Sequence, residues 1–212
     1  MKKELVKRIL SSIVLLPAIF FLIIKGSILF NSFLIICFFI SIYEWSKIVK
    51  KNLYKLLGIL FLLVSFYSIY KIRTSSVDDY LFLLFITTIC ISTDIGGYIF
   101  GKIFKGPKLT KFSPNKTISG MIGAFILSIL SMYFFILNEK IIDTFSINII
   151  VFTILISVIS QLGDIIVSYF KRLSNIKDTG NIIPGHGGLL DRIDGMIFAF
   201  PITYILFTVD LI

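Results

Sequence analysis

The most polar stretch of this chain carries the groups that bind phosphates and metal ions. Residues 171–195, KRLSNIKDTGNIIPGHGGLLDRIDG, combine four cationic side chains, three aspartates, the only histidine of the chain and five glycines. Lysines and arginines donate charge-assisted hydrogen bonds to phosphate oxygens, and glycine-rich backbone with uncrowded amides forms anion-binding nests. Mg²⁺ binds through one or two carboxylates together with the phosphates of a substrate. The segment therefore predicts a site for a phosphorylated substrate and a divalent metal ion.

An aspartate inside the preceding apolar run extends this site. Asp164 lies in LISVISQLGDIIVSYFKR, and an ionisable residue within an apolar span is costly enough to indicate a functional site. Gln161 precedes it by three residues, whereas Ser168 and Lys171 follow by four and seven, so a helix places all four on one face. The spacing predicts a polar stripe that leads into residues 171–195. The alternative is an aspartate that only pairs with a lysine of another helix.

Other acidic residues give weaker signals. Asp94 stands in ISTDIGGYIFGK, where two following glycines permit close approach of a helix or a ligand, or simply helix packing. Glu44 adjoins Trp45, and an interfacial Trp is ordinary in membrane proteins. Asp191 and Asp194 are three residues apart and can share a helical face. His186 alone is a poor metal ligand because no second His or Cys accompanies it, so a phosphate contact or an orienting hydrogen bond suits it better.

The elements that must position these residues are membrane-spanning helices. The chain of 212 residues is 57% hydrophobic, only 16% charged and has a mean hydropathy of +0.97, too few polar residues for the surface of a soluble domain. We therefore expect one all-α integral membrane domain over residues 1–212, since helices pair their backbone groups internally. The seven predicted spans are 9–25, 27–43, 56–71, 80–99, 118–137, 146–170 and 195–211.

The two cysteines give no sign of a disulfide. Cys37 and Cys90 lie in apolar runs and are predicted to be free thiols.

Charge placement predicts the orientation of these spans. If the N-terminus is cytoplasmic, all but four of the 21 lysines and arginines fall in cytoplasmic segments, the four being Lys25, Lys71, Arg73 and Lys140. Residues 171–195 and a second basic loop at 102–117 then both face the cytoplasm, where nucleotides are found. The net charge of +9 follows mainly from this bias, and we expect no nucleic-acid binding.

With these motifs in place, the chain resembles the phosphatidate cytidylyltransferases (CDP-diacylglycerol synthases). The loop DIGGYIFGKIFKGPKLTKFSPNKTISG, residues 94–120, is similar to a second block of that family, although Asn115 and Ser119 stand where lysine and an acidic residue are frequent. The resemblance covers about residues 90–212. The family's fixed-spacing signature is matched at Ser168, Lys171, Arg172, Lys177, Asp178, Gly180, Pro184, His186, Gly187, Gly188, Asp191, Arg192 and Asp194.

The resemblance implies transfer of CMP from CTP to phosphatidate, giving CDP-diacylglycerol and pyrophosphate, with the lipid phosphate as the nucleophile. It implies Asp164 and Asp191 as metal ligands, with Asp178 and Asp194 supporting them. The catalytic residues it implies are Asp164, Lys171, Lys177, Asp178, His186, Asp191, Arg192 and Asp194. The substrate-binding residues it implies are Asp94, Lys111, Ser113, Lys116, Thr117, Ser168, Arg172, Gly187 and Gly188.

The same resemblance implies Mg²⁺, allows a second cation such as K⁺, and suggests a homodimer in the inner (cytoplasmic) membrane. Three other functions stay open on the residues. A cation transporter or channel would use the buried acids but not the cationic, glycine-rich segment. An inactive scaffold would not need the intact motif. A relative that acts on another lipid, such as a polyprenol kinase or an ether-lipid cytidylyltransferase, would share most of these residues.

Overall fold

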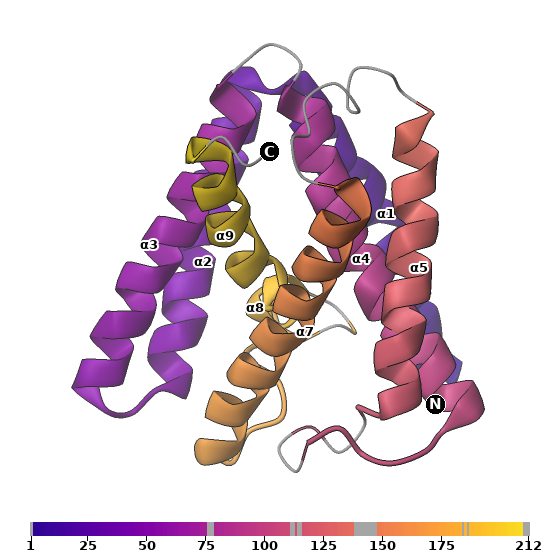
Figure 1. Ribbon diagram of the computed structural model, residues 1–212. Coiled ribbons are helices and arrows are strands. Elements are labelled where there is room, and N and C mark those ends of the chain that lie inside the picture. Colours follow the sequence, from indigo (N-terminus) through magenta and orange to yellow (C-terminus); the bar gives the residue numbers. More distant parts are fainter. Residues whose placement is uncertain are drawn as a thin grey trace.

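The chain is helical throughout most of the part that the structure describes (Figure 1). The computed structural model describes residues 2–75, 79–110, 113, 116–137, 148–183, 185 and 187–209, with only the backbone for residues 2–12 and 79. The all-α prediction is confirmed for these residues. Their eight helices are α1 (Lys2–Lys25), α2 (Ser27–Ile48), α3 (Asn52–Thr74), α4 (Asp79–Phe104), α5 (Ile118–Ile136), α7 (Ile149–Leu173), α8 (Leu190–Ile193) and α9 (Met196–Thr208).

Each predicted span coincides with a helix, but the spans differ in length. Within the described residues, five helices are long and apolar enough to cross a membrane: α2, α3, α4, α5 and α7. The apolar part of α1, Ile13–Lys25, and α9 are shorter. At a rise of 1.5 Å per residue, α9 covers roughly 20 Å of a hydrocarbon core that is about 30 Å thick. The chain is a multi-pass membrane protein, with five full-length spans described where the sequence predicted seven.

The helices form two outer groups, and a third group lies between them. In Figure 1, α2 and α3 make an antiparallel hairpin on one side, α4 and α5 pack together on the other, and α7 and α9 lie between them. The start of α1, the α2–α3 turn, the loop after α4 and the segment after α7 all lie at the same end of the bundle. The polar segments that the charge pattern assigned to one side of the membrane are therefore gathered at one end of the fold.

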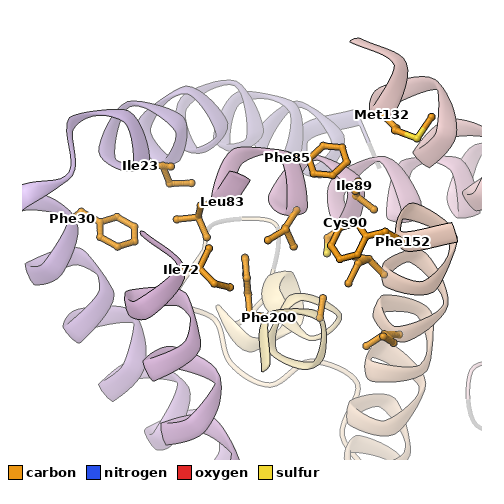
Figure 2. Close-up of a cluster of buried hydrophobic side chains, with 14 residues drawn as sticks. Ile23, Phe30, Ile72, Leu83, Phe85, Ile89, Cys90, Met132, Phe152 and Phe200 are labelled. Carbon is orange, nitrogen blue, oxygen red and sulfur yellow. The ribbon is translucent and has the colours of Figure 1, made fainter. Parts of the chain in front are cut away.

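A buried apolar cluster joins the two groups at the opposite end from these loops. Figure 2 shows side chains from α1, α2, α3, α4, α5, α7 and α9 meeting there, among them Phe85 and Phe152, both fully buried. Cys90 belongs to this cluster and is fully buried, and Cys37 is buried in a second cluster. Both cysteines are free, as predicted.

Glycines set the distance between α4 and α5. A Cβ atom built on Gly96 would come within 2.4 Å of the carbonyl oxygen of Gly123, and one on Gly120 within 2.7 Å of that of Gly97. Backbones this close exclude any larger residue. The prediction that the glycines after Asp94 permit a close approach is confirmed, and the approaching element is α5. This contact brings the start of α5, and the basic loop before it, beside Asp94.

Candidate active site

A cavity of about 330 Å³ opens where the two sequence motifs meet. Its walls come from α4, the loop at 105–117, the start of α5, α7, the segment after α7, and α8. The two motifs are separated by tens of residues in the chain and share this single space. The polar and charged residues that line it are Thr93, Asp94, Tyr98, Ser113, Lys116, Thr117, Gln161, Asp164, Lys171, Asp178, Asp191, Arg192 and Asp194.

The polar stripe predicted on α7 is present. Gln161, Asp164 and Lys171 all face the cavity. Ser168 is buried below them, and its hydroxyl donates to Asp164 Oδ1 at 3.1 Å. Because Ser168 orients the carboxylate and does not line the cavity, its contact with Asp164 is the role that the geometry supports.

The basic loop closes onto this stripe through one lysine. Lys116 Nζ lies 2.6 Å from Asp164 Oδ2 and donates to the backbone oxygen of Gln161 at 3.2 Å. The side chains of Lys116 and Asp164 keep 22% and 26% of their exposure, so solvent still reaches the pair. An ion pair between an intramembrane aspartate and a lysine of another element was the alternative reading of Asp164. The structure contains that pair, and it lies in the wall of the cavity.

The loop holds Lys116 in place by folding back on itself. Leu109 N–H donates to the Lys116 carbonyl at 2.8 Å, within an antiparallel bridge between Lys108 and Thr117. Thr117 is the N-cap of α5, where its hydroxyl accepts from the Gly120 amide at 3.1 Å. Ser113 lines the cavity beside them. The predicted residue Lys111 lies outside the described residues.

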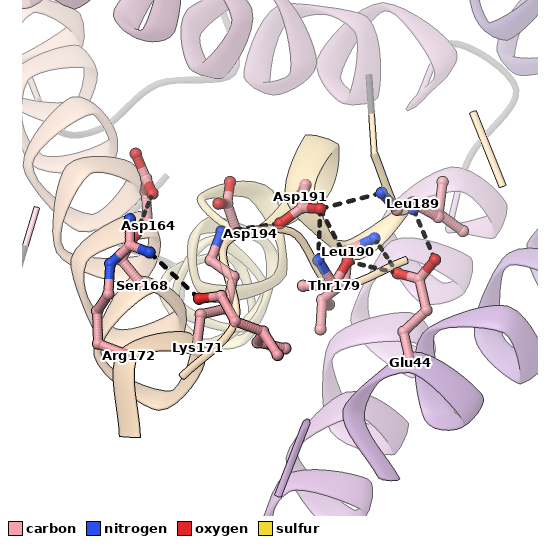
Figure 3. Close-up of polar contacts among 12 residues, drawn as sticks. Glu44, Asp164, Ser168, Lys171, Arg172, Thr179, Leu189, Leu190, Asp191 and Asp194 are labelled. Atoms are coloured by element: carbon pink, nitrogen blue, oxygen red, sulfur yellow. Dashed lines mark hydrogen bonds and ion pairs between the residues drawn. The ribbon is translucent and has the colours of Figure 1, made fainter. Parts of the chain in front are cut away.

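The segment after α7 is organised around Asp191. Figure 3 shows its carboxylate between Lys171 and Thr179. Lys171 Nζ donates to Oδ1 at 2.8 Å, while Oδ2 accepts from Thr179 N–H at 2.7 Å, from the Thr179 hydroxyl at 3.0 Å and from Gly188 N–H at 3.0 Å. The Gly188 amide, expected to be free for an anion, is therefore engaged by Asp191. Gly187 has a φ of +85°, and a Cβ there would lie 2.8 Å from Asp191 Oδ2.

Glu44 is a buried member of this site that the sequence interpretation undervalued. Its carboxylate, fully buried on α2, accepts from the Thr179 hydroxyl at 2.9 Å, from Leu189 N–H at 3.0 Å and from Leu190 N–H at 2.8 Å. In the sequence, Glu44 is the only acidic residue between positions 27 and 48. A single acidic residue within an apolar run is the feature of the sequence that could have predicted a role for Glu44.

Five aspartates line the cavity, and one of them, Asp194, is buried and lies outside the long helices. Burial raises the pKa of the Asp194 carboxyl well above its usual value, and the nearby charges of Asp164 and Asp94 raise it further. An opposite charge nearby favours the ionised form of a carboxyl group, so a bound cation would offset this repulsion. Among the described residues, no three His, Cys, Asp or Glu side chains form a preassembled metal cluster. Mg²⁺ does not need one, since it binds through one or two carboxylates plus substrate phosphates, so the oxygen donors here fit it.

Of the remaining predicted residues, two line the cavity, two lie away from it and one lies outside the described part. Arg172 and Lys177 are exposed, and Arg172 Nη1 donates to the Ile176 carbonyl at 3.2 Å. Neither lines the cavity, whereas Asp178 and Arg192 do. His186 lies outside the described residues, so its predicted phosphate contact stays a prediction.

The chain is similar to known proteins over most of its length. Residues 53–210 match the model of the cytidylyltransferase family. A phosphatidate cytidylyltransferase of Rickettsia bellii (strain RML369-C) is 34% identical over 212 residues, covering 96% of this chain and 90% of that protein. Those of Staphylococcus haemolyticus (strain JCSC1435) and Staphylococcus saprophyticus subsp. saprophyticus are 38% and 37% identical, each over 71% of this chain. The matched part spans 57% of the length of each staphylococcal protein. The chain belongs to the cytidylyltransferase family.

Proposed function

We propose that this chain is a phosphatidate cytidylyltransferase, which transfers CMP from CTP to phosphatidate and releases pyrophosphate. The observation that carries the proposal is the single cavity that joins Lys116 and Asp164 to Lys171 and Asp191. The two lysines suit a triphosphate, and the two carboxylates suit a metal ion that binds with it. The site lies toward one end of a membrane bundle, where a triphosphate can meet a lipid headgroup. The names of the relatives point to the same reaction.

The reaction requires no nucleophile from the protein. A phosphate oxygen of phosphatidate attacks the α-phosphorus of CTP. The bond from that phosphorus to the oxygen bridging to the β-phosphate breaks, and pyrophosphate leaves with the electron pair. The protein's part is to align the two phosphates and to offset charge on the leaving group. The cavity has cationic groups for this, because Lys116, Lys171 and Arg192 all line it.

The metal roles follow the carboxylates. Asp164 and Asp191 are the proposed Mg²⁺ ligands, with Asp178 and Asp194 in support, and a second cation such as K⁺ is compatible with this many oxygens. When bound, Mg²⁺ would neutralise triphosphate charge. In the structure, Lys116 pairs with Asp164 and Lys171 pairs with Asp191, so each proposed ligand has a lysine as its partner. A triphosphate that enters the cavity would compete for these ammonium groups, most readily for that of Lys116, because its pair with Asp164 is the more exposed one.

The membrane arrangement belongs to the same proposal. We place the chain as one domain of seven passes in the inner membrane, with a cytoplasmic N-terminus and both loops in the cytoplasm. The gathering of these loops at one end of the bundle supports this orientation. Acyl chains could then remain in the bilayer while the headgroup meets cytosolic CTP. We also propose a homodimer, in keeping with the family resemblance.

The test uses purified protein, phosphatidate and Mg²⁺ with CTP labelled in either its α- or its γ-phosphate. Cytidylyl transfer moves the α-label into the lipid fraction and releases the γ-label as pyrophosphate. A lipid kinase would do the reverse, so label from the γ-position in lipid would overturn the proposal. The same holds for ion transport without any CTP turnover. Replacement of phosphatidate by polyprenol or by an ether-linked phosphatidate identifies the preferred acceptor.

A further inference from the structure

The contacts of Glu44 cross from the N-terminal helices into the catalytic segment. Glu44 belongs to α2, whereas Thr179, Leu189 and Leu190 lie in or next to the segment between α7 and α8. All three partners are donors, and the carboxylate is fully buried. Burial of an acidic group is tolerated only when hydrogen bonds replace water, so these contacts hold the segment at a fixed position against α2.

A hydroxyl connects this carboxylate to Asp191. Thr179 Oγ1 lies 2.9 Å from Glu44 Oε2 and 3.0 Å from Asp191 Oδ2. One hydroxyl has a single proton and donates to one carboxylate at a time. Thr179 N–H supplies a separate bond to Asp191 at 2.7 Å, which holds the residue in place. Glu44 thus fixes the group that orients Asp191, and Asp191 in turn binds Lys171.

Two glycines of the segment leave room for Glu44. A Cβ atom on Gly180 would lie 2.7 Å from Glu44 Oε1. One on Gly188 would lie 2.5 Å from Glu44 Oε2 and 2.0 Å from the Thr179 hydroxyl. Any side chain at Gly188 would displace this contact. The glycine at this position therefore has a packing reason that is independent of any bound phosphate.

The end of α2 supports the segment at further points. The Ser174 hydroxyl donates to the Ile48 carbonyl, and the Trp45 ring packs edge-on against Phe170 with centroids 4.9 Å apart. Together with Glu44, these contacts make the last turns of α2 a platform for the end of α7 and the segment that follows. The position of Asp191, one of the two metal ligands proposed above, thus depends on a helix outside the sequence motifs.

We propose that Glu44 is a positioning residue of the active site, which sets the place of Asp191 through Thr179 and the start of α8. Glu44 does not line the cavity, so it acts through its partners and not on substrate. The inference rests on the proposed function only for the readout of enzymatic activity. A second readout, hydrogen exchange in the segment 176–193, tests the contacts of Glu44 without any assumption about the reaction.

The experiment compares Glu44→Gln with Ser41→Ala in detergent-purified protein. Ser41 is also fully buried on α2, but its hydroxyl donates to Cys37 within the same helix, so it is a matched control. Glutamine keeps the shape of Glu44 but presents an amide donor to groups that are themselves donors. We expect faster exchange of the Leu189 and Leu190 amides, with α4 and α5 unchanged, and a fall in kcat of about tenfold or more that exceeds the rise in KM for CTP. Ser41→Ala should change neither.

Thr179 provides a second pair of variants. Thr179→Val removes the hydroxyl at similar volume and should lower kcat, and Thr179→Ser should recover most of that loss because it restores the donor. Exchange in 176–193 that stays at the wild-type rate in Glu44→Gln would overturn the proposal. So would a uniform increase in exchange across all helices, or equal kcat values for the valine and serine variants. If the wild-type protein shows no CTP turnover, the function fails, yet the exchange comparison still decides the role of Glu44.

Discussion

Two lysine–aspartate pairs lie in the same cavity and differ in how firmly they are held. Lys116 and Asp164 are 2.6 Å apart, with side chains 22% and 26% exposed. Lys171 and Asp191 are 2.8 Å apart, with side chains only 10% and 5% exposed. Asp164 has a hydroxyl donor in Ser168, whereas Asp191 accepts from the amides of Thr179 and Gly188 and shares the Thr179 hydroxyl with Glu44.

This difference suggests that the Lys116–Asp164 contact is replaceable, whereas the Lys171–Asp191 contact is structural. Solvent reaches the Lys116–Asp164 pair but hardly reaches the Lys171–Asp191 pair, and solvent and salt weaken an ion pair that they reach, so Asp164 can exchange Lys116 for another cation at a smaller cost than Asp191 can exchange Lys171. Asp191 cannot move without leaving the buried amides of Thr179 and Gly188 unpaired, and that loss is costly. Asp191 thus has two tasks, to shape the segment and to face the cavity, while Asp164 has one.

Asp191→Asn should have the largest effect because it disrupts both tasks. Both oxygens of Asp191 accept from donors, so the amide nitrogen of asparagine would face a donor in either orientation, and we expect product formation to fall below about 0.1% of wild type. The apparent melting temperature in detergent should drop by roughly 2–10 °C, for a loss of about 1–3 kcal/mol. Activity is measured by α-labelled CTP and stability by thermal unfolding. Lost activity with an unchanged melting temperature would show that Asp191 does not organise the segment.

Asp164→Asn should abolish activity to a similar extent but leave the segment intact. The variant removes a proposed metal ligand, yet Lys116 is partly exposed and keeps its hydrogen bond to the Gln161 carbonyl, so stability should change by less than about 1 kcal/mol. Hydrogen exchange in 176–193 should match wild type. Activity above about a tenth of wild type would contradict the metal assignment, and faster exchange in the segment would remove the contrast with Asp191.

Helical periodicity predicted much of one wall of this site. Gln161, Asp164 and Lys171 were expected on one face because their spacing fits 3.6 residues per turn, and they line the cavity together. The apolar runs located the helices by their length, because a helix needs roughly 20 apolar residues to cross a bilayer. Local pattern was enough here because the stripe and each span belong to a single helix.

Contacts between distant elements were beyond the reach of such patterns. Lys116 and Asp164 are 48 positions apart in the chain and meet because the loop before α5 lies against α7. The sequence shows the glycines that let α5 approach α4, but it does not show which helix they face. Glu44 was undervalued because its importance comes from Thr179 and Leu190, more than a hundred positions away. Helix length was also harder to judge, since apolar residues continue past the point where α9 ends within the described part.

The two lysines should differ in the kinetic constant that they change. Lys116→Gln removes a partly exposed charge from the loop, so we expect the KM for CTP to rise by about tenfold with a smaller change in kcat. Its effect should weaken as salt increases. Lys171→Gln removes the donor of the enclosed pair and should lower kcat more than it raises KM. Steady-state kinetics at two ionic strengths test both variants, and the same pattern for both would mean that enclosure does not distinguish the pairs.

Ser168→Ala should have the smallest effect, and it tests how firmly Asp164 is held. The alanine variant removes the 3.1 Å hydrogen bond to Asp164 Oδ1 but leaves both Lys116 and the carboxylate in place. A single hydrogen bond to a charged group is worth about 1.5–3 kcal/mol at most, and part of that is regained from solvent in the partly exposed site, so we expect kcat to fall about three- to tenfold. Thr153→Val is the control, because Thr153 is a fully buried residue of α7 whose hydroxyl donates to Ile149 of the same helix. If Ser168→Ala lost as much activity as Asp164→Asn, the serine would have a direct part in binding substrate. The contacts of Asp164 would then be as hard to replace as those of Asp191, and the contrast between the two pairs would fail.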